Sequence, residues 1–161
     1  MIVISPIRGG WMGRVFGDWQ LAPILSARSG AALNITTGVD NSLTGQGQDR
    51  PNRILANQYA DNKSVASWLN RAAFTPNALG TFGNLGRYTA VGPGNFQFDA
   101  SLSRRFAYRE RIRLEARFEA FNVINHTNLK GPTTTLNAPN FGAILGAGDP
   151  RILLIALKLH F

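Results

Sequence analysis

Charged residues that could act together on a ligand lie in the second half of the chain. Arg113, Glu115, Arg117 and Glu119 occupy every second position, and Asp99 precedes them. Alternate residues of an extended chain point to the same face. Asp99 and Glu119 could also be interpreted as an acid and base pair. Carboxylates beside arginines more simply balance charge on a wet surface. We therefore predict that these five side chains face a polar lumen, where Arg113 and Arg117 would guide anionic substrates.

Other groups with catalytic or metal-binding chemistry are isolated. The chain has no cysteine, and no cysteine or paired carboxylate accompanies His126 or His160, so the usual metal-ligand sets are missing. There is no Gly-x-Ser-x-Gly element or phosphate-binding loop. Gly45-Gln-Gly47 and Gly92-Pro-Gly94 lack the flanking strand and helix of a nucleotide loop and are typical of turns. We expect no metal, no cofactor and no enzymatic activity.

The net charge of +8 and the pI of about 11.1 raise nucleic-acid binding as an alternative, because basic surfaces displace counterions from phosphates. Six arginines fall between Arg104 and Arg117, but glutamates alternate with arginines along one face there. No helix-turn-helix, zinc finger or aromatic ribonucleoprotein motif is present. We therefore expect no nucleic acid partner, and steep salt dependence of binding would be the signature of this alternative.

The end of the chain has the pattern of a strand between two unlike environments. Apolar residues recur at every second position of residues 151–161, and Lys158 and His160 fall on the opposite face. This length is about the 9–11 residues with which a tilted strand crosses a bilayer. The last strand of a soluble sandwich or a short buried helix is the alternative for this segment. The residues of the apolar face are Leu153, Ile155, Leu157, Leu159 and Phe161.

Two strands are predicted in the first half of the chain. Residues 17–28 alternate in the manner of a strand, although Pro23 cannot donate a hydrogen bond to a ladder. After a predicted bulge at Ser29-Gly30, residues 31–37 continue as an extended segment that ends in β-branched residues.

Two further strands are predicted in the second half. Residues 95–106 show the clearest period of two in the chain, with apolar residues opposite glutamine, aspartate and serine. Residues 111–124 could instead form a helix, because leucine and phenylalanine recur there at helical spacing. Ile112 does not fit that helical face but fits a strand, and a bulge near Ala120-Phe121 would explain the change of phase. We predict a strand.

The segments between these strands are of two kinds. Residues 38–94 and 125–150 are long, irregular and rich in Gly, Asn and Pro, whereas the connection from Phe106 to Arg111 is short. Tracing the strands back from Phe161 places both long segments on one side. This asymmetry is typical of outer-membrane barrels, which have long external loops and short periplasmic turns. The predicted fold is all-β, with four to five antiparallel strands of a transmembrane β-barrel. A soluble β-sandwich or lipocalin-like binding module is the alternative.

The chain resembles a known family, the C-terminal barrel of TonB-dependent outer-membrane receptors. The similarity is to the Oar-like group, whose members often carry a carboxypeptidase-regulatory-like domain, and it covers about the whole chain after the first dozen residues. The order and spacing of short pieces together carry this resemblance. These are Gly17-Asp-Trp-Gln20, Ser29-Gly30, Arg50-Pro-Asn52, Trp68-Leu-Asn70, Ala73-Phe74, Phe82-Gly-Asn-Leu-Gly-Arg87, Gly92-Pro-Gly94, Asp99, Phe118-Glu-Ala-Phe-Asn122, Asn125-His126, Asn140-Phe-Gly142, Arg151 and Phe161.

The resemblance implies a barrel of roughly 22 strands around an N-terminal plug, which imports or binds large substrates with energy passed on by TonB. Residues 1–161 would be the C-terminal part of this barrel in the outer membrane of a Gram-negative cell. We expect the plug, the TonB-contacting region and the signal peptide to lie upstream of this fragment, which should not transport anything alone. The implied partners are outer-membrane lipid, the TonB complex through those missing regions, and the barrel-assembly machinery, which would recognise the alternating apolar residues that end at Phe161.

Overall fold

The computed structural model describes residues 2–4, 10, 17–109 and 112–161. The chain forms two compact units. The strand unit contains residues up to Ala27 together with Phe96–Asn128 and Asp149–Phe161, and the loop unit contains Arg28–Asn95 and Leu129–Gly148. Within the described ranges, there is no helix with the length and apolar character needed to span a bilayer.

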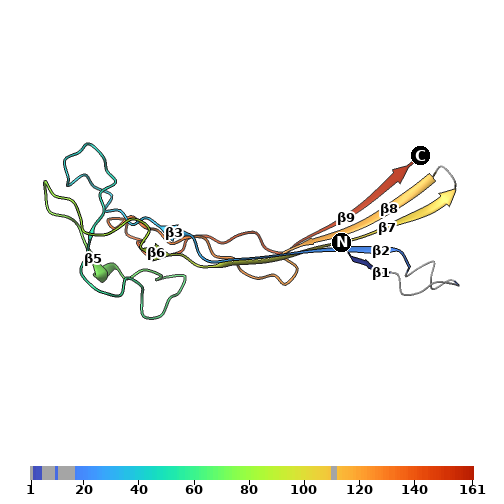
Figure 1. Ribbon diagram of the computed structural model, residues 1–161, viewed down its shortest axis with the longest axis horizontal. Coiled ribbons are helices and arrows are strands. Elements are labelled where there is room, and N and C mark those ends of the chain that lie inside the picture. The colour runs from blue at the N-terminus through green and yellow to red at the C-terminus, as the bar shows by residue number, and fades with distance from the viewer. Residues whose placement is uncertain (1, 5–9, 11–16, 110–111) are drawn as a thin grey trace. The chain divides into compact units, whose positions relative to one another are not determined.

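The strand unit is a five-stranded sheet in the order β1-β2-β7-β8-β9, and its strands lie side by side in Figure 1. The strands are β1 (Ile2–Ile4), β2 (Trp19–Arg28), β7 (Asn95–Arg109), β8 (Ile112–Phe121) and β9 (Ile152–His160). The predicted all-β fold with four to five antiparallel strands is confirmed. The sheet does not close on itself, since β1 and β9 are its two edges.

Continuous pairing explains why residues 112–121 form a strand. Strand β8 pairs antiparallel with both β7 and β9, and its register with β9 is unbroken from Arg113 to Phe121. The helical alternative for this segment is therefore wrong, and so is the bulge near Ala120-Phe121. The ladder is instead irregular between Ala107 and Arg109 on β7. The short connection from β7 to β8 includes residues 110–111, which lie outside the described residues.

Strand β2 contains a proline, Pro23, and ends at Arg28, just before Ser29-Gly30. Among the described residues, β1 pairs with Trp19–Leu21 and not with Pro23, and a proline is tolerated where its nitrogen need not donate to a neighbouring strand. The expected bulge at Ser29-Gly30 is a strand end, because β2 stops at Arg28. A Cβ atom on Gly30 would lie only 1.8 Å from the Gly92 carbonyl oxygen, so this turn requires glycine.

The loop unit is more ordered than its sequence pattern indicates. Strand β3 (Ala32–Leu33) pairs with β6 (Ala90–Val91), β4 (Asn52–Arg53) pairs with β5 (Phe74–Thr75), and η1 (Arg71–Ala73) is a single 3-10 turn. The expectation of long irregular loops is therefore only partly correct. The unit has a hydrophobic core of Leu33, Ile35, Leu69, Ala73, Phe74, Leu85, Ala90, Leu136 and Phe141.

Main-chain hydrogen bonds join the two segments of the loop unit. The Thr36 amide donates to the Thr134 carbonyl oxygen at 3.1 Å, and the Leu136 amide donates to the Thr36 carbonyl oxygen at 2.8 Å. Thr36 and Thr135 thus form a parallel bridge. The prediction that residues 31–37 form an extended segment is confirmed in part, because only Ala32–Leu33 form a strand, β3.

A buried carboxylate organises one loop of this unit. The Asp49 carboxylate accepts hydrogen bonds from the Ser42 hydroxyl at 2.6 Å, from the Ser42 amide at 2.7 Å and from the Asn77 side chain at 3.2 Å. These bonds, the Ser42 hydroxyl first, hold the pKa of Asp49 below its ordinary value despite the opposing effect of burial. They therefore stabilise the folded loop most when the carboxylate is charged.

We expect acid to destabilise this loop through Asp49. Because the folded-state pKa is lowered, the stabilisation is complete above the unfolded-state pKa of about 4. It is lost as the pH falls through the lower folded-state value. The measurement is the thermal midpoint of the full-length protein and of Asp49→Asn between pH 7 and pH 3. The variant should be less stable at neutral pH and should converge with the wild type in acid. Parallel curves would contradict the assignment.

Candidate functional site

The candidate site is a charged face of the strand unit built around β8. Arg113, Glu115, Arg117 and Glu119 share this face because alternate residues of a strand point to the same side. The register sets Glu115 opposite Arg105 on β7 and opposite Lys158 on β9. The charged face therefore combines side chains from three strands.

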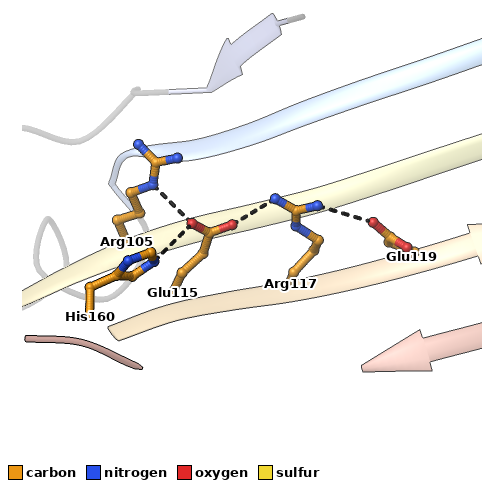
Figure 2. A network of polar contacts seen from close by, with 5 residues as sticks. All are labelled: Arg105, Glu115, Arg117, Glu119 and His160. Atoms are coloured by element: carbon orange, nitrogen blue, oxygen red, sulfur yellow. Dashed lines mark hydrogen bonds and ion pairs between the residues drawn. The ribbon is translucent and has the colours of Figure 1, made fainter. Parts of the chain in front are cut away.

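Glu115 is the centre of a network of ion pairs, shown in Figure 2. Its carboxylate lies 3.0 Å from the Arg105 Nε atom, 2.7 Å from an Arg117 guanidinium nitrogen and 3.9 Å from the His160 Nε2 atom. Arg117 also reaches Glu119 at 3.5 Å. The Glu115 side chain is 9% exposed, whereas Arg105 and Arg117 are 68% and 46% exposed. One shielded carboxylate therefore orients two arginines whose outer surfaces remain accessible to solvent.

The structure brings together three of the five residues predicted to face the lumen: Glu115, Arg117 and Glu119. Arg113 lies on the same face opposite His160, but it belongs to none of the ion pairs in the described part of the chain. The sequence reasoning missed Arg105 and His160. The sequence indicates which face of its strand each residue occupies. The distance from each residue to Glu115 depends on how the strands pair, which the sequence pattern does not give.

Asp99, on β7, forms a separate set of hydrogen bonds beside the end of β8. Its carboxylate accepts a hydrogen bond from the Asn122 amide at 2.9 Å and from the Gln97 side chain at 3.0 Å. Asn122 has a positive φ of 51°, and its side chain bonds the main chain of His126 and Asp149. Asp99 therefore holds the turn after β8. Among the described residues, the Asp99 and Glu119 carboxylates have different partners.

A second asparagine, Asn125, also stabilises the turn after β8. Asn125 also has a positive φ, of 53°, and asparagine tolerates this region better than most residues. Its side-chain oxygen accepts a hydrogen bond from the Arg151 amide at 3.0 Å, which ties the turn to the start of β9. His126 lies in this turn, whereas His160 lies at the far end of β9. Among the described residues, no group of three or more potential ligands could hold a metal ion.

The opposite face of the sheet is apolar, and on β9 it is exposed. On β9, Leu153, Ile155, Leu157 and Leu159 are 57% to 74% exposed, and Phe161 is 98% exposed. The first four are paired with Ala120, Phe118, Ala116 and Leu114 of β8. Soluble monomers rarely leave such a contiguous apolar surface in water. This face therefore suits hydrocarbon.

One cation lies on the apolar face in spite of its charge. Arg104 is opposite Ala116 and is only 6% exposed. Its guanidinium carbon is 4.6 Å from the ring centroid of Phe106 and 5.9 Å from that of Trp19. Aromatic faces attract cations, so these rings partly compensate for the loss of water around Arg104.

We expect Glu115→Gln to loosen the charged face more than Glu119→Gln. The first variant removes the charge that attracts Arg105 and Arg117, and the second removes only a contact of 3.5 Å. The effect should be modest, because the arginines are exposed and water screens them. The measurement is the urea midpoint of the full-length protein in lipid vesicles at low and high salt. Equal midpoints for the two variants would contradict the central role of Glu115.

A family model described as an outer membrane beta barrel domain matches residues 4–153. Searches of curated proteins and of solved structures found no match. The family match agrees with the two unlike faces of the sheet and with its membrane-length strands. The chain therefore belongs to the family of outer membrane beta barrel domains.

Proposed function

We propose that this chain is the C-terminal part of the barrel of a TonB-dependent outer-membrane receptor of the Oar-like group. Such a protein binds or imports large substrates across the outer membrane of a Gram-negative cell. The observation that carries the proposal is the pairing of a charged face with an exposed apolar face on one sheet. A barrel wall needs both, because one side meets the aqueous lumen and the other meets lipid.

The proposal requires further strands. Membrane barrels have at least about eight strands, and this sheet has five with open edges at β1 and β9. Unpaired strand edges are costly in hydrocarbon, since no water is present to bond their amides and carbonyls. We infer that the remaining strands and a plug come from residues outside this sequence. These 161 residues alone would not transport a substrate.

Each proposed partner would contact a different part of the barrel. Lipid would cover the apolar face, and the TonB complex would contact the plug region. The barrel-assembly machinery would recognise the alternating residues from Leu153 to Phe161, which are exposed. The charged face would contact the plug or a passing substrate. No step in this proposal needs catalysis or a cofactor.

The test uses the full-length protein with its preceding residues, produced in a Gram-negative host. We expect it to fractionate with the outer membrane and to be captured by the purified C-terminal domain of TonB. Removal of the segment proposed to contact TonB should abolish capture without releasing the protein from the membrane. A protein that reaches the outer membrane but is never captured would contradict the TonB-dependent role and leave the barrel family intact.

A further inference from the structure

The loop unit contains an open pocket of about 600 Å³. This volume lies within the range of small-molecule sites, roughly 300–1,000 Å³. The polar residues Asp61, Ser67, Asn70 and Arg71 contribute to its lining, together with Ala60 and Ala72. Phe141 also lines it but is only 7% exposed. The pocket belongs entirely to the loop unit.

The main chain holds the walls of this pocket in place. Ala60 donates to the Trp68 carbonyl oxygen at 3.2 Å, and the Asn70 amide donates to the Gln58 carbonyl oxygen at 3.0 Å. The neighbouring Leu69 side chain is 1% exposed and belongs to the hydrophobic core. Residues 60–70 are therefore anchored on two sides. A pocket that is already formed loses little conformational freedom when a ligand binds.

The Arg71 side chain is also held in place, and the hydrogen bonds that hold it use both of its terminal nitrogens. Its two terminal guanidinium nitrogens donate to the carbonyl oxygens of Leu136 and Ala138. Its guanidinium carbon is 5.4 Å from the Phe141 ring centroid. Arg71 thus holds the second loop segment against η1, and its charge contributes to the pocket from a fixed position.

The lining favours a neutral, hydroxyl-rich ligand. The charges of Asp61 and Arg71 are opposite, so the pocket has no strong preference for an ion. The Asp61 carboxylate can accept hydrogen bonds, and the Ser67 hydroxyl can both donate and accept them. The side-chain NH2 group of Asn70 can donate. Ala60 and Ala72 offer small apolar contacts. A sugar presents hydroxyl groups beside C–H surfaces and matches this combination.

We propose that this pocket binds a neutral oligosaccharide, and that this is the substrate class of the proposed receptor. The inference rests on the proposed function, because a receptor displays its loops to the ligand. Sugar hydroxyls would bond Asp61, Ser67 and Asn70, and a C–H face of the sugar would lie against Ala60 and Ala72.

The test uses the full-length protein in outer-membrane vesicles and an array of neutral oligosaccharides of two to four sugars. Anionic oligosaccharides and neutral short peptides are included on the same array. Ser67→Trp fills the pocket, and Ala66→Trp is its matched control, because Ala66 is exposed and is not part of the lining. Asp61→Ala removes an acceptor, and Asn62→Ala is its exposed neighbour control.

We expect the wild type to retain at least one neutral oligosaccharide. Asp61→Ala should weaken that binding by about tenfold or more, the usual effect of losing a charged hydrogen bond. Ser67→Trp should weaken it at least as much, because the indole occupies the space of the sugar. The two controls should bind as the wild type does, and the melting temperatures of all variants should show whether the loop unit remains folded. Asp61→Ala provides a second test if Ser67→Trp does not fold.

Three results would overturn the inference. These are no retention of any neutral oligosaccharide at millimolar concentration, equal binding by pocket variants and controls, or Ser67-dependent binding of only anionic sugars or peptides. Capture by the TonB domain is measured on the same vesicles. Capture without sugar binding removes this inference alone, whereas sugar binding without capture removes the TonB-dependent role.

Discussion

Replacing Leu157 with lysine is expected to destabilise the full-length protein in lipid by roughly 2–4 kcal/mol, the cost of a cation near the middle of the lipid-facing surface of a barrel. Leu157 lies close to the middle of β9, on the apolar face, and is 70% exposed. If lipid covers this face, the new ammonium group must leave water or distort the bilayer. The measurement is the urea unfolding midpoint of protein folded into lipid vesicles.

The chain provides a matched control for this prediction. Leu154→Lys makes the same substitution in the same strand but places the lysine opposite Glu119 on the charged face. Its cost should be small, because a carboxylate and a wet surface are available there. If Leu154→Lys is as damaging as Leu157→Lys, the assignment of the two faces is wrong. If both are harmless, the sheet does not lie in a membrane.

Replacing Gly83 with alanine is expected to cost about 3 kcal/mol or more, at the upper end of overpacking effects, and to disrupt the loop unit. A Cβ atom at this position would lie 1.9 Å from the Arg50 carbonyl oxygen and 2.5 Å from the Pro51 carbonyl oxygen. Main-chain atoms cannot rotate away as a side chain can. The segment would have to separate from residues 50–53, which it contacts through several hydrogen bonds.

Those hydrogen bonds explain why relaxation is costly. Leu85 donates to the Pro51 carbonyl oxygen at 3.1 Å. The Asn84 amide donates to the Asn52 side chain at 2.9 Å, and the Arg53 amide donates to the Asn84 side chain at 2.8 Å. Moving Gly83 outward would strain all three bonds. Their loss would also open the core at Leu85, which is 3% exposed.

Gly47→Ala is the control for Gly83→Ala. A Cβ atom on Gly47 would have nothing within 4 Å, so this variant should melt like the wild type. The measurements are limited proteolysis of residues 28–95 and the thermal midpoint of the full-length protein. Rapid cleavage of Gly83→Ala, with Gly47→Ala resistant, is the expected result. Equal resistance of the two variants would mean that residues 50–53 do not approach Gly83 so closely.

These variants address different parts of the proposed receptor. Leu157→Lys tests whether the strand unit is a membrane wall, whereas Gly83→Ala tests whether the loop unit is a folded body. A folded loop unit matters for binding, because a fixed pocket loses less entropy than a flexible loop when it captures a ligand.

Alternation alone is sufficient to predict β7 and β9. Residues 95–106 and 151–161 contain a clear period of two, and β7 and β9 occupy almost the same positions. For residues 111–124 the period was mixed, and a helix remained an alternative until β8 was seen to pair on both sides. Short pieces such as Phe118-Glu-Ala-Phe-Asn122 supported the barrel, and the family match at residues 4–153 confirms an outer membrane beta barrel domain.

The sequence by itself thus determined β2, β7, β8 and β9, their two faces and the barrel family, because a period of two is a local property. Only the tertiary structure decided which charges meet. Arg105, Glu115 and His160 come from three strands, and a shift of register would separate them. The core of the loop unit was also hidden, since Ile35, Leu69 and Phe141 follow no common period. Main-chain hydrogen bonds between distant segments bring these residues together, and no local pattern contains that information.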